Sequence, residues 1–363
     1  MTATTAGPDP AVVAGIEGLT PDWLTAALAT TSGTARIRTL RTEPVGTGQM
    51  ATTVRIHLDT DDGPRTLIAK VARDDVRPEM ARMAYEKEVA FYDELRDRLA
   101  MRIPGCLYAA MDPDSVRFVL LLEDMAGARP GDQIAGCTPD HARAAVVNLA
   151  GLHGPTWCDE ALRTAEWLAG DPEASTEILA PFLAIAADGF EARFLAEMDD
   201  GERAVLAASR ELLVPWLVSA GDRFAVLHGD YRLDNLLFPT DDPAGVAAVD
   251  WQTASLGPPG RDLAYFLGTS LSTEDRRRHE ADLLEAYHRA LADQGVTDYT
   301  LEDCWADYRL GMLHGPLIIL LGRLTATVTD RGDEMFRVMW QRCARAILDL
   351  GTLDAIRAAV GRS

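Results

Sequence analysis

The spacing of hydrophobic and polar residues changes part-way along the chain. In the first third, short segments such as 53–58, 66–71 and 116–122 alternate apolar and polar residues or are continuously apolar, and turn-forming residues separate them. Such segments predict β-strands joined by tight turns. From about residue 138 onward, apolar residues recur at helical spacing, which predicts mainly helices. The pattern therefore predicts an α+β protein, with an antiparallel sheet first and a helical part after it.

One long helix is predicted inside the sheet-rich part, over residues 79–99, and its apolar stripe contains a glutamate. The stripe consists of Ala84, Glu88, Phe91, Leu95 and Leu99. Lys70 is likewise charged but lies inside an apolar strand. A buried charge is costly unless it is paired, so we expect Lys70 and Glu88 to form an ion pair. A purely structural ion pair and a solvent-exposed Glu88 are the alternatives at this point.

The most polar motif of the chain is HGDYRLDN, residues 228–235, which lies between two short apolar runs. A turn-forming segment and a second apolar segment follow, so residues 236–250 predict a β-hairpin. In an antiparallel hairpin the start of the first strand lies beside the end of the second. Asn235 and Asp250 are therefore expected to converge, with Asp230 close by.

These residue types suit phosphoryl transfer with a magnesium ion. The amide oxygen of Asn235 and the carboxylate of Asp250 are oxygen ligands, which Mg²⁺ prefers, and Mg²⁺ usually takes further ligands from phosphates. Asp230 is then left to accept the proton of a substrate hydroxyl. The structural alternative is a turn rich in Asp and Asn that only caps strands.

The motif resembles the catalytic loop of protein-kinase-like phosphotransferases, H-x-D with Asn five residues later and then a metal-binding Asp. The HGD spelling, with Gly where protein kinases carry Arg, is similar to the aminoglycoside phosphotransferase, choline kinase and ecdysteroid kinase branch. The resemblance covers roughly residues 40–350. It implies a protein-kinase-like two-lobe fold. Residues 1–124 would form a nucleotide-binding lobe of antiparallel sheet and one long helix, and residues 125–363 a mainly helical lobe with the catalytic β-hairpin.

The resemblance also implies nucleotide-binding roles in the first lobe. Lys70 would hold the phosphates of ATP, and Glu88 would position Lys70. Gly46 and Gly48 would let backbone amides approach a phosphate, although two glycines between strands are also an ordinary turn. The P-loop pattern G-x-x-x-x-G-K does not occur.

The end of the strand at 119–122 corresponds to the hinge between lobes in the resembled family. There the Glu123 carbonyl and the Met125 amide would bind the adenine edge; a plain strand-to-helix linker is the alternative. A second Asp braces the catalytic loop in that family, but we expect Asp262 to act as the N-cap of the next helix. Gln252 departs from the acidic residue of many relatives, which leaves the number of metal ions open.

The amino-acid composition limits the classes of molecule that this chain is expected to bind. Asp and Glu total 56 against 35 for Lys and Arg, so the net charge is −21, and this argues against nucleic acid or an anionic membrane. The five cysteines are scattered without a C-x-x-C pair, so a disulfide framework or zinc site is not indicated and a cytoplasmic location fits. The N-terminal residues lack the features of a signal peptide, and the longest apolar run, 316–321, is too short to span a bilayer.

We therefore expect a phosphotransferase that uses Mg²⁺ and moves the γ-phosphate of ATP to a hydroxyl of a small molecule, either amine-bearing or hydrophobic. A protein kinase would need a long activation segment after the metal Asp, whereas Asp262 follows Asp250 by only twelve residues. A nucleotide-binding pseudokinase-type sensor would normally lack a functional residue, and none is missing. Candidates for the acceptor pocket come from the distal helices and are Trp157, Glu160, Asp303, Asp307, Tyr308 and His314.

Overall fold

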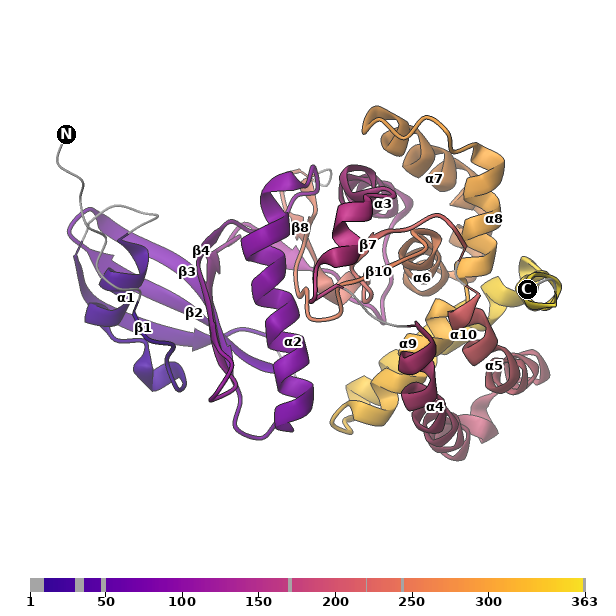
Figure 1. Cartoon of the computed structure of the whole chain (residues 1–363), viewed down its shortest axis with the longest axis horizontal. Helices are drawn as coiled ribbons and strands as arrows, with labels where there is room; N and C mark the ends of the chain where they lie inside the picture. The colour runs from indigo at the N-terminus through magenta and orange to yellow at the C-terminus, as the bar shows by residue number, and fades with distance from the viewer. Residues whose placement is uncertain are drawn as a thin grey trace. The chain divides into compact units, whose positions relative to one another are not determined.

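The computed structural model describes residues 10–29, 36–46, 50–168, 172–219, 221–242 and 245–361. Contacts within the chain divide it into two compact units, which are described separately below (Figure 1). Unit 1 comprises residues 1–97, 103–126 and 250–252, and unit 2 comprises residues 98–102, 127–249 and 253–363. Asp250, the last residue of the predicted hairpin, and the two residues after it therefore belong to the first unit.

Unit 1 is built on a five-stranded antiparallel sheet in the order β1-β2-β3-β5-β4. The strands are β1 (Ile37–Pro44), β2 (Ala51–Thr60), β3 (Gly63–Ala72), β4 (Cys106–Asp112) and β5 (Arg117–Glu123). Helix α1 (Pro21–Leu28) packs on the face that carries Ala69 and Val71. Because side chains alternate along a strand, Lys70 points to the opposite face, on which α2 (Pro78–Ala90) lies (Figure 1).

The predicted helix over 79–99 is a continuous helical run but not one regular α-helix. After α2 the chain makes a π-helical turn, Phe91–Leu95, and then a 3-10 turn, Arg96–Arg98. Within the π turn, the ring of Phe91 stacks on Trp251 of the same unit, with centroids 3.6 Å apart and an interplanar angle of 8°. π-helical turns are rare and are often found at functional sites.

Unit 2 is mainly helical, as the sequence predicts. Its α-helices are α3 (Pro139–His153), α4 (Pro172–Phe194), α5 (Asp200–Val218), α6 (Gly260–Ser270), α7 (Thr273–Asp293), α8 (Leu301–Gly311), α9 (His314–Thr325), α10 (Asp330–Asp349) and α11 (Thr352–Val360). Gly311 ends α8, and a Cβ there would lie 2.3 Å from the carbonyl oxygen of Gly260. Gly351, with φ of +60°, separates α10 from α11.

Short strands in unit 2 form two small sheets. Strand β7 (Ala225–Leu227) pairs with β10 (Ser255–Gly257), and β8 (Leu236–Pro239) lies between β6 (Ala128–Pro130) and β9 (Ala247–Ala248). The antiparallel pair β8 and β9 is the predicted hairpin, with Leu236 opposite Ala248. The predicted α+β architecture, an antiparallel sheet with one long helical run followed by a mainly helical part, is thus confirmed.

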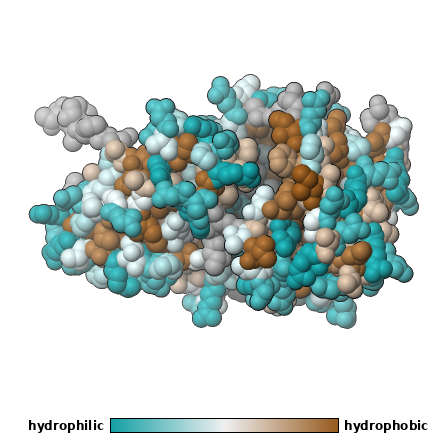
Figure 2. Space-filling model, turned by 90° about the horizontal axis from the view of Figure 1, so that it is seen from below, coloured by the Kyte–Doolittle hydropathy of each residue, from teal (hydrophilic) through white to brown (hydrophobic). Residues whose placement is uncertain are grey.

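Hydrophilic and hydrophobic residues are both present on the surface. Figure 2 shows one face, on which hydrophilic residues surround separate hydrophobic areas. All five cysteines are free thiols. Among the helices that the structure describes, none has both the length and the apolarity that crossing a membrane requires.

Candidate active site

An ion pair joins Lys70 of β3 to Glu88 of α2, as expected from the sequence. Lys70 Nζ lies 2.5 Å from Glu88 Oε1 and 3.2 Å from Oδ1 of Asp250, and all three residues belong to unit 1. The Glu88 side chain is 0% exposed and the Asp250 side chain is 42% exposed. Gln252 donates from Nε2 to the second oxygen of Glu88 at 3.1 Å. One buried and one half-exposed carboxylate therefore hold a single ammonium group.

The charges of this cluster affect one another strongly. Burial alone would lower the pKa of Lys70, but the carboxylates of Asp250 and Glu88 outweigh it, so the pKa is raised above 10.5. Burial raises the pKa of Glu88, and the positive charge of Lys70 only partly opposes that rise. Lys70 therefore keeps its charge at physiological pH.

The backbone of the HGD loop in unit 2 is held by one carboxylate. Asp262 accepts the N–H of His228 at 2.6 Å and the N–H of Gly229 at 3.0 Å. Burial would raise the pKa of Asp262, but His153 and the other nearby histidines outweigh it, and the pKa is lowered. The expectation of an N-cap is wrong: α6 begins at Gly260, and Asp262 lies inside its first turn. Its side chain turns instead to the two loop amides, which would otherwise be buried without acceptors.

Gly229 is the residue that lets the chain turn sharply in this loop. Its φ is +81°, and a Cβ there would lie 2.6 Å from the carbonyl oxygen of Thr253. His314 contacts the Gly229 carbonyl through Nε2 at 2.9 Å. His228 contacts the carbonyl of Val249 through Nε2 at 3.0 Å, so its ring also has a backbone partner. A residue other than glycine would therefore displace the loop.

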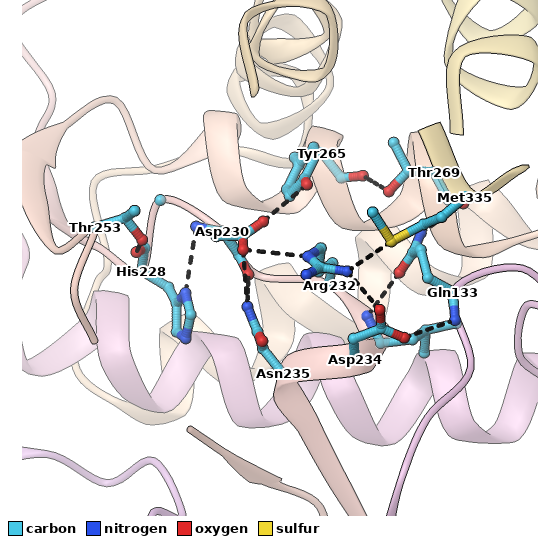
Figure 3. A network of polar contacts seen from close by, with 12 residues as sticks. Gln133, His228, Asp230, Arg232, Asp234, Asn235, Thr253, Tyr265, Thr269 and Met335 are labelled. Carbon is cyan, nitrogen blue, oxygen red and sulfur yellow. Dashed lines mark hydrogen bonds and ion pairs between the residues drawn. The ribbon is translucent and has the colours of Figure 1, made fainter. Parts of the chain in front are cut away.

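The carboxylate of Asp230 is surrounded by hydrogen-bond donors (Figure 3). The hydroxyl of Tyr265 donates to Oδ1 at 2.9 Å, and Asn235 Nδ2 donates to Oδ2 at 2.9 Å. Arg232 donates from Nε to Oδ2 at 3.1 Å, and the Asp230 side chain is 24% exposed. Because Asn235 uses its amide nitrogen here, its amide oxygen is the atom that could bind a cation.

A second layer of contacts fixes this loop to a distant segment (Figure 3). Gln133 accepts the N–H of Leu233 at 2.9 Å through its side chain and donates its own backbone N–H to Asp234 at 3.0 Å. Arg232 donates to Asp234 at 2.7 Å as well as to Asp230. Sequence reasoning assigned no role to Gln133 or Tyr265, because the partner of each lies far along the chain.

The predicted nucleotide-binding residues lie in or after the strands of unit 1. Gly46 follows β1 and has a φ of +70°, with open space where a Cβ would lie. Gly48 lies outside the described residues. Glu123 ends β5, and its backbone N–H and carboxylate both bond to Gly105. Met125 lies two residues later and is half-buried.

An ion pair that the sequence did not reveal anchors the segment after β5. Asp124 has a side chain only 2% exposed and accepts two hydrogen bonds from Arg55 of β2, at 2.8 and 3.1 Å. The backbone on either side of Asp124 is therefore held against the sheet.

The proposed metal ligands are contributed by different units, Asn235 by unit 2 and Asp250 by unit 1. The N–H of Val249 donates to the carbonyl of Asn235 at 3.0 Å, and Asp250 is the next residue. Asp250 has a φ of +72°, an uncommon conformation for a residue with a Cβ. Among described residues, no group of three or more His, Cys, Asp or Glu side chains could hold a metal ion.

Some residues expected near an acceptor have structural partners. Tyr308 is fully buried, and its hydroxyl donates to Glu280 at 3.1 Å. Asp307 accepts two hydrogen bonds from Arg223, each of 3.0 Å. These contacts favour a role in packing the helices over a role in binding substrate.

Comparison with known families settles the relationship. Residues 47–295 match the model of the ecdysteroid kinase-like family, which is more than half of the 363 residues. The chain belongs to the ecdysteroid kinase-like family. The resemblance inferred from the HGD motif is therefore confirmed.

Similarity to individual proteins is more limited. A segment of 58 residues is 40% identical to acyl-CoA dehydrogenase family member 10 of Mus musculus and covers 15% of this chain and 5% of that protein. A match of 69 residues is 37% identical to acyl-CoA dehydrogenase family member 11 of Gallus gallus, covering 16% of this chain and 9% of that protein. The chain thus spans only a small part of the length of these curated relatives.

Solved structures share the fold of this ecdysteroid kinase-like chain. An ethanolamine kinase of Plasmodium vivax has a TM-score of 0.53 and 11% identity, over 92% of this chain and 90% of that one. A choline kinase of Cryptosporidium parvum Iowa II has a TM-score of 0.53 and 9% identity, over 86% and 91%. The GDP complex of wild-type aminoglycoside 2'-phosphotransferase-IIIa has a TM-score of 0.52 and 15% identity, over 89% and 98%. At such identities the likeness shows the fold alone.

Proposed function

We propose that this chain is an ATP-dependent small-molecule O-kinase, which moves the γ-phosphate of ATP to a hydroxyl group. The observation that carries the proposal is the Asp230 carboxylate, which receives hydrogen bonds from Tyr265, Asn235 and Arg232. It lies on a loop whose backbone Asp262 holds at two amides. Membership of a kinase-like family and the shared kinase fold support the same reaction class.

In this reaction Asp230 is the general base. The substrate hydroxyl gives its proton to an oxygen of the Asp230 carboxylate, and the hydroxyl oxygen forms a bond to the γ-phosphorus. The bond from that phosphorus to the bridging oxygen breaks, and ADP leaves. Positioning and electrostatics dominate phosphoryl transfer, so the base contributes about 10²–10⁴-fold in rate. The three donors hold the carboxylate in one orientation.

The residues of unit 1 fit the phosphates of a nucleotide. Lys70 is positively charged, and its ion pair with the buried Glu88 fixes the position of its ammonium group. In the proposal Lys70 holds ATP phosphates, while backbone amides at Gly46 and Gly48 approach them. The Glu123 carbonyl and Met125 amide bind the adenine edge, with the segment between them held by Asp124. The GDP complex of a fold relative makes GTP the second nucleotide to test.

The donor set also fits Mg²⁺, which prefers oxygen ligands and takes several from phosphates and water. Asn235 would bind through its amide oxygen, because its nitrogen donates to Asp230. Asp250 would bind through its half-exposed carboxylate. When bound there, the ion would neutralise charge on the phosphates. Residues 1–124 then form the nucleotide-binding lobe and residues 125–363 the catalytic lobe, with Asp250 returning to pack with the first.

The acceptor is a small hydroxylated molecule. Two fold relatives are an ethanolamine kinase and a choline kinase, which act on amine-bearing alcohols by name. The matching family is named after ecdysteroid kinases, and this favours a hydrophobic alcohol. We therefore propose to screen both classes, with turnover measured by coupled detection of ADP.

Two variants test the assignment once an acceptor is found. Asp230→Asn keeps the shape of the side chain but removes the proton acceptor, so single-turnover kinetics should show a rate about 10²–10⁴-fold lower with ATP affinity nearly unchanged. Asp250→Ala should abolish binding of Mg-ATP in calorimetry. Asp241→Asn, an exposed carboxylate in the turn of the same hairpin, is the matched control and should behave like wild type.

The possible results separate the roles. A wild-type rate in Asp230→Asn would show that another group or water takes the proton. Loss of ATP binding in that variant would move Asp230 to the metal site. Nucleotide binding without transfer to any acceptor in the screen would instead support a nucleotide-sensing protein.

A further inference from the structure

A cavity of about 550 Å³ in unit 2 has an unusual set of side chains on its walls. Its lining residues are Ser272, Thr273, Arg277, Gln341, Arg342 and Arg345. Three of these are arginines and none is acidic, although Asp and Glu outnumber Lys and Arg by 56 to 35 in the chain. The cavity lies where α7 begins, beside the later part of α10, and shares no residue with the Asp230 network.

Arg342 is a cation on this wall that has only neutral partners. Its Nη1 donates to the carbonyls of Gln133 and Thr269 at 2.8 and 3.1 Å, and its Nη2 donates to the carbonyl of Ile134 at 2.8 Å. A guanidinium has five N–H donors, so the Nε hydrogen and one on Nη2 are left. Within the described residues no carboxylate forms a salt bridge with Arg342. Burial lowers its pKa, yet a guanidinium remains charged at physiological pH.

The other arginines of the wall are held in place by carboxylates at the edge. Arg277 makes two hydrogen bonds to Asp349, at 2.7 and 2.8 Å, and Arg345 bonds to Asp199. Such paired arginines carry less net charge than Arg342, but their guanidinium groups are fixed and keep further donors.

The start of α7 adds to the positive potential of the cavity. This helix is 21 residues long, and the aligned peptide dipoles make its N-terminal end positive. Ser272 caps it by accepting the N–H of Asp275 at 3.0 Å. Glu274 and Asp275 in the first turn oppose this potential. Glu274 forms an ion pair with Arg278 at 2.6 Å, and Asp275 accepts the hydroxyl of Ser272 at 2.8 Å.

We propose that this cavity binds a phosphate-bearing small molecule, with Arg342 as its central ligand. Phosphate oxygens accept several hydrogen bonds at once and suit arginine donors. The cavity volume falls within the range of about 300–1,000 Å³ for small-molecule sites, so it has room for more than one phosphate group. This site is separate from the proposed nucleotide site, and the proposal does not depend on the kinase assignment.

Arg342 also connects the cavity to the support of the HGD loop. Its neutral partners include the carbonyl of Gln133, and the side chain of Gln133 holds the N–H of Leu233. Occupancy of the cavity is therefore expected to slow amide exchange at the start of α7 and in residues 131–136.

The test is calorimetric titration of the full chain with sodium pyrophosphate at constant ionic strength. Gln341 is exposed on the cavity wall, so its charge can be changed with little effect on folding. Gln341→Glu should weaken binding about tenfold, and Gln341→Lys should tighten it several-fold. Arg342→Gln should weaken binding about tenfold or more, since it removes a charged donor. Arg289→Gln, which removes the same charge near the other end of α7, is the control and should leave affinity unchanged.

Hydrogen exchange then locates the ligand. Protection by pyrophosphate at residues 272–277 supports the site, together with opposite effects of the two Gln341 variants. Equal affinity in wild type and both Gln341 variants would overturn the proposal. So would protection confined to β3, or no heat of binding at millimolar pyrophosphate.

Discussion

The hydroxyl of Tyr265 donates a hydrogen bond to Oδ1 of Asp230 at 2.9 Å. Tyr265 lies on α6, the same helix whose first turn carries Asp262. One helix therefore holds both the backbone of the HGD loop and the side chain of its aspartate. Burial raises the pKa of Tyr265 well above 10.0, so the hydroxyl stays protonated and remains a donor.

Replacing this tyrosine tests whether the hydrogen bond positions the proposed base. Tyr265→Phe removes a donor that orients the Asp230 carboxylate, so the carboxylate should adopt more than one orientation. We expect kcat to fall about tenfold while the KM and the affinity for ATP stay unchanged. Tyr299→Phe, which loses a similar bond to Asp307 of 3.1 Å, is the matched control and should keep the wild-type kcat. A wild-type kcat in Tyr265→Phe would exclude this role.

The two hydrogen bonds from the HGD loop amides to Asp262 can be tested through both stability and rate. Asp262→Asn places an amide group where two backbone N–H donors need acceptors, so one donor loses its partner. The free energy of unfolding should fall by about 1–3 kcal/mol, measured by urea denaturation. Because the HGD loop loses its support, kcat should fall while the Kd for nucleotide changes little. Asp307→Asn, which loosens an ion pair away from the loop, should cost stability without that loss of kcat.

Removing one partner of the Lys70–Glu88 pair should be far more costly than neutralising both. Lys70→Met leaves the fully buried Glu88 without its counter-ion, and the expected loss is about 3–5 kcal/mol. In Lys70→Met with Glu88→Gln the buried charge is gone, so much of the stability should return, while nucleotide binding stays lost. Urea denaturation and a fluorescent nucleotide measure the two effects. Equal stability of the single and double variants would mean that Glu88 is already neutral when Lys70 is absent.

The buried His314 predicts a dependence of stability on pH. Burial lowers its pKa from 6.5 in the folded chain, so below about pH 6.5 the unfolded chain binds the extra proton. The neutral, buried His314 makes its full contribution to the free energy of unfolding above about pH 6.5. This contribution is lost as the pH falls toward the pKa of His314 in the folded chain, by up to about 1.4 kcal/mol per pH unit. His314→Gln keeps a donor for the Gly229 carbonyl but cannot titrate there. Its urea midpoint should fall less than that of wild type between about pH 7.5 and 5.5, and equal falls would contradict the assignment.

Local patterns were enough to predict the elements that depend on neighbours in sequence. The turn residues and apolar runs of 236–250 predicted the hairpin because register in a hairpin follows from its own loop and strands. The cost of burying Lys70 and Glu88 predicted their pairing for a similar reason, since each charge lies on an apolar face of its own element. The spelling of the HGD motif also indicated the family before any fold was known.

Where a side chain had to serve a distant part of the chain, the sequence misled or was silent. Asp262 precedes an apolar helical stretch and so resembles a cap, but the amides that need its oxygens belong to His228 and Gly229. Gln133 binds a backbone group 100 residues away, and no local signal marks such a partner. The π-helical turn at Phe91–Leu95, where Phe91 stacks on Trp251, likewise interrupts a helix for which the local periodicity gave no sign of a break.

The amino-acid sequence by itself therefore determined the kind of fold and the family. These depend on hydrophobic period, turn chemistry and the types of residue within one short motif. Only the tertiary structure decided which residues hold the loop around Asp230, and it alone brought three arginines to one cavity. The physical reason is that buried backbone groups and charges must find partners in space, and those partners are chosen by the packing of α6, α7 and α10 rather than by their order along the chain.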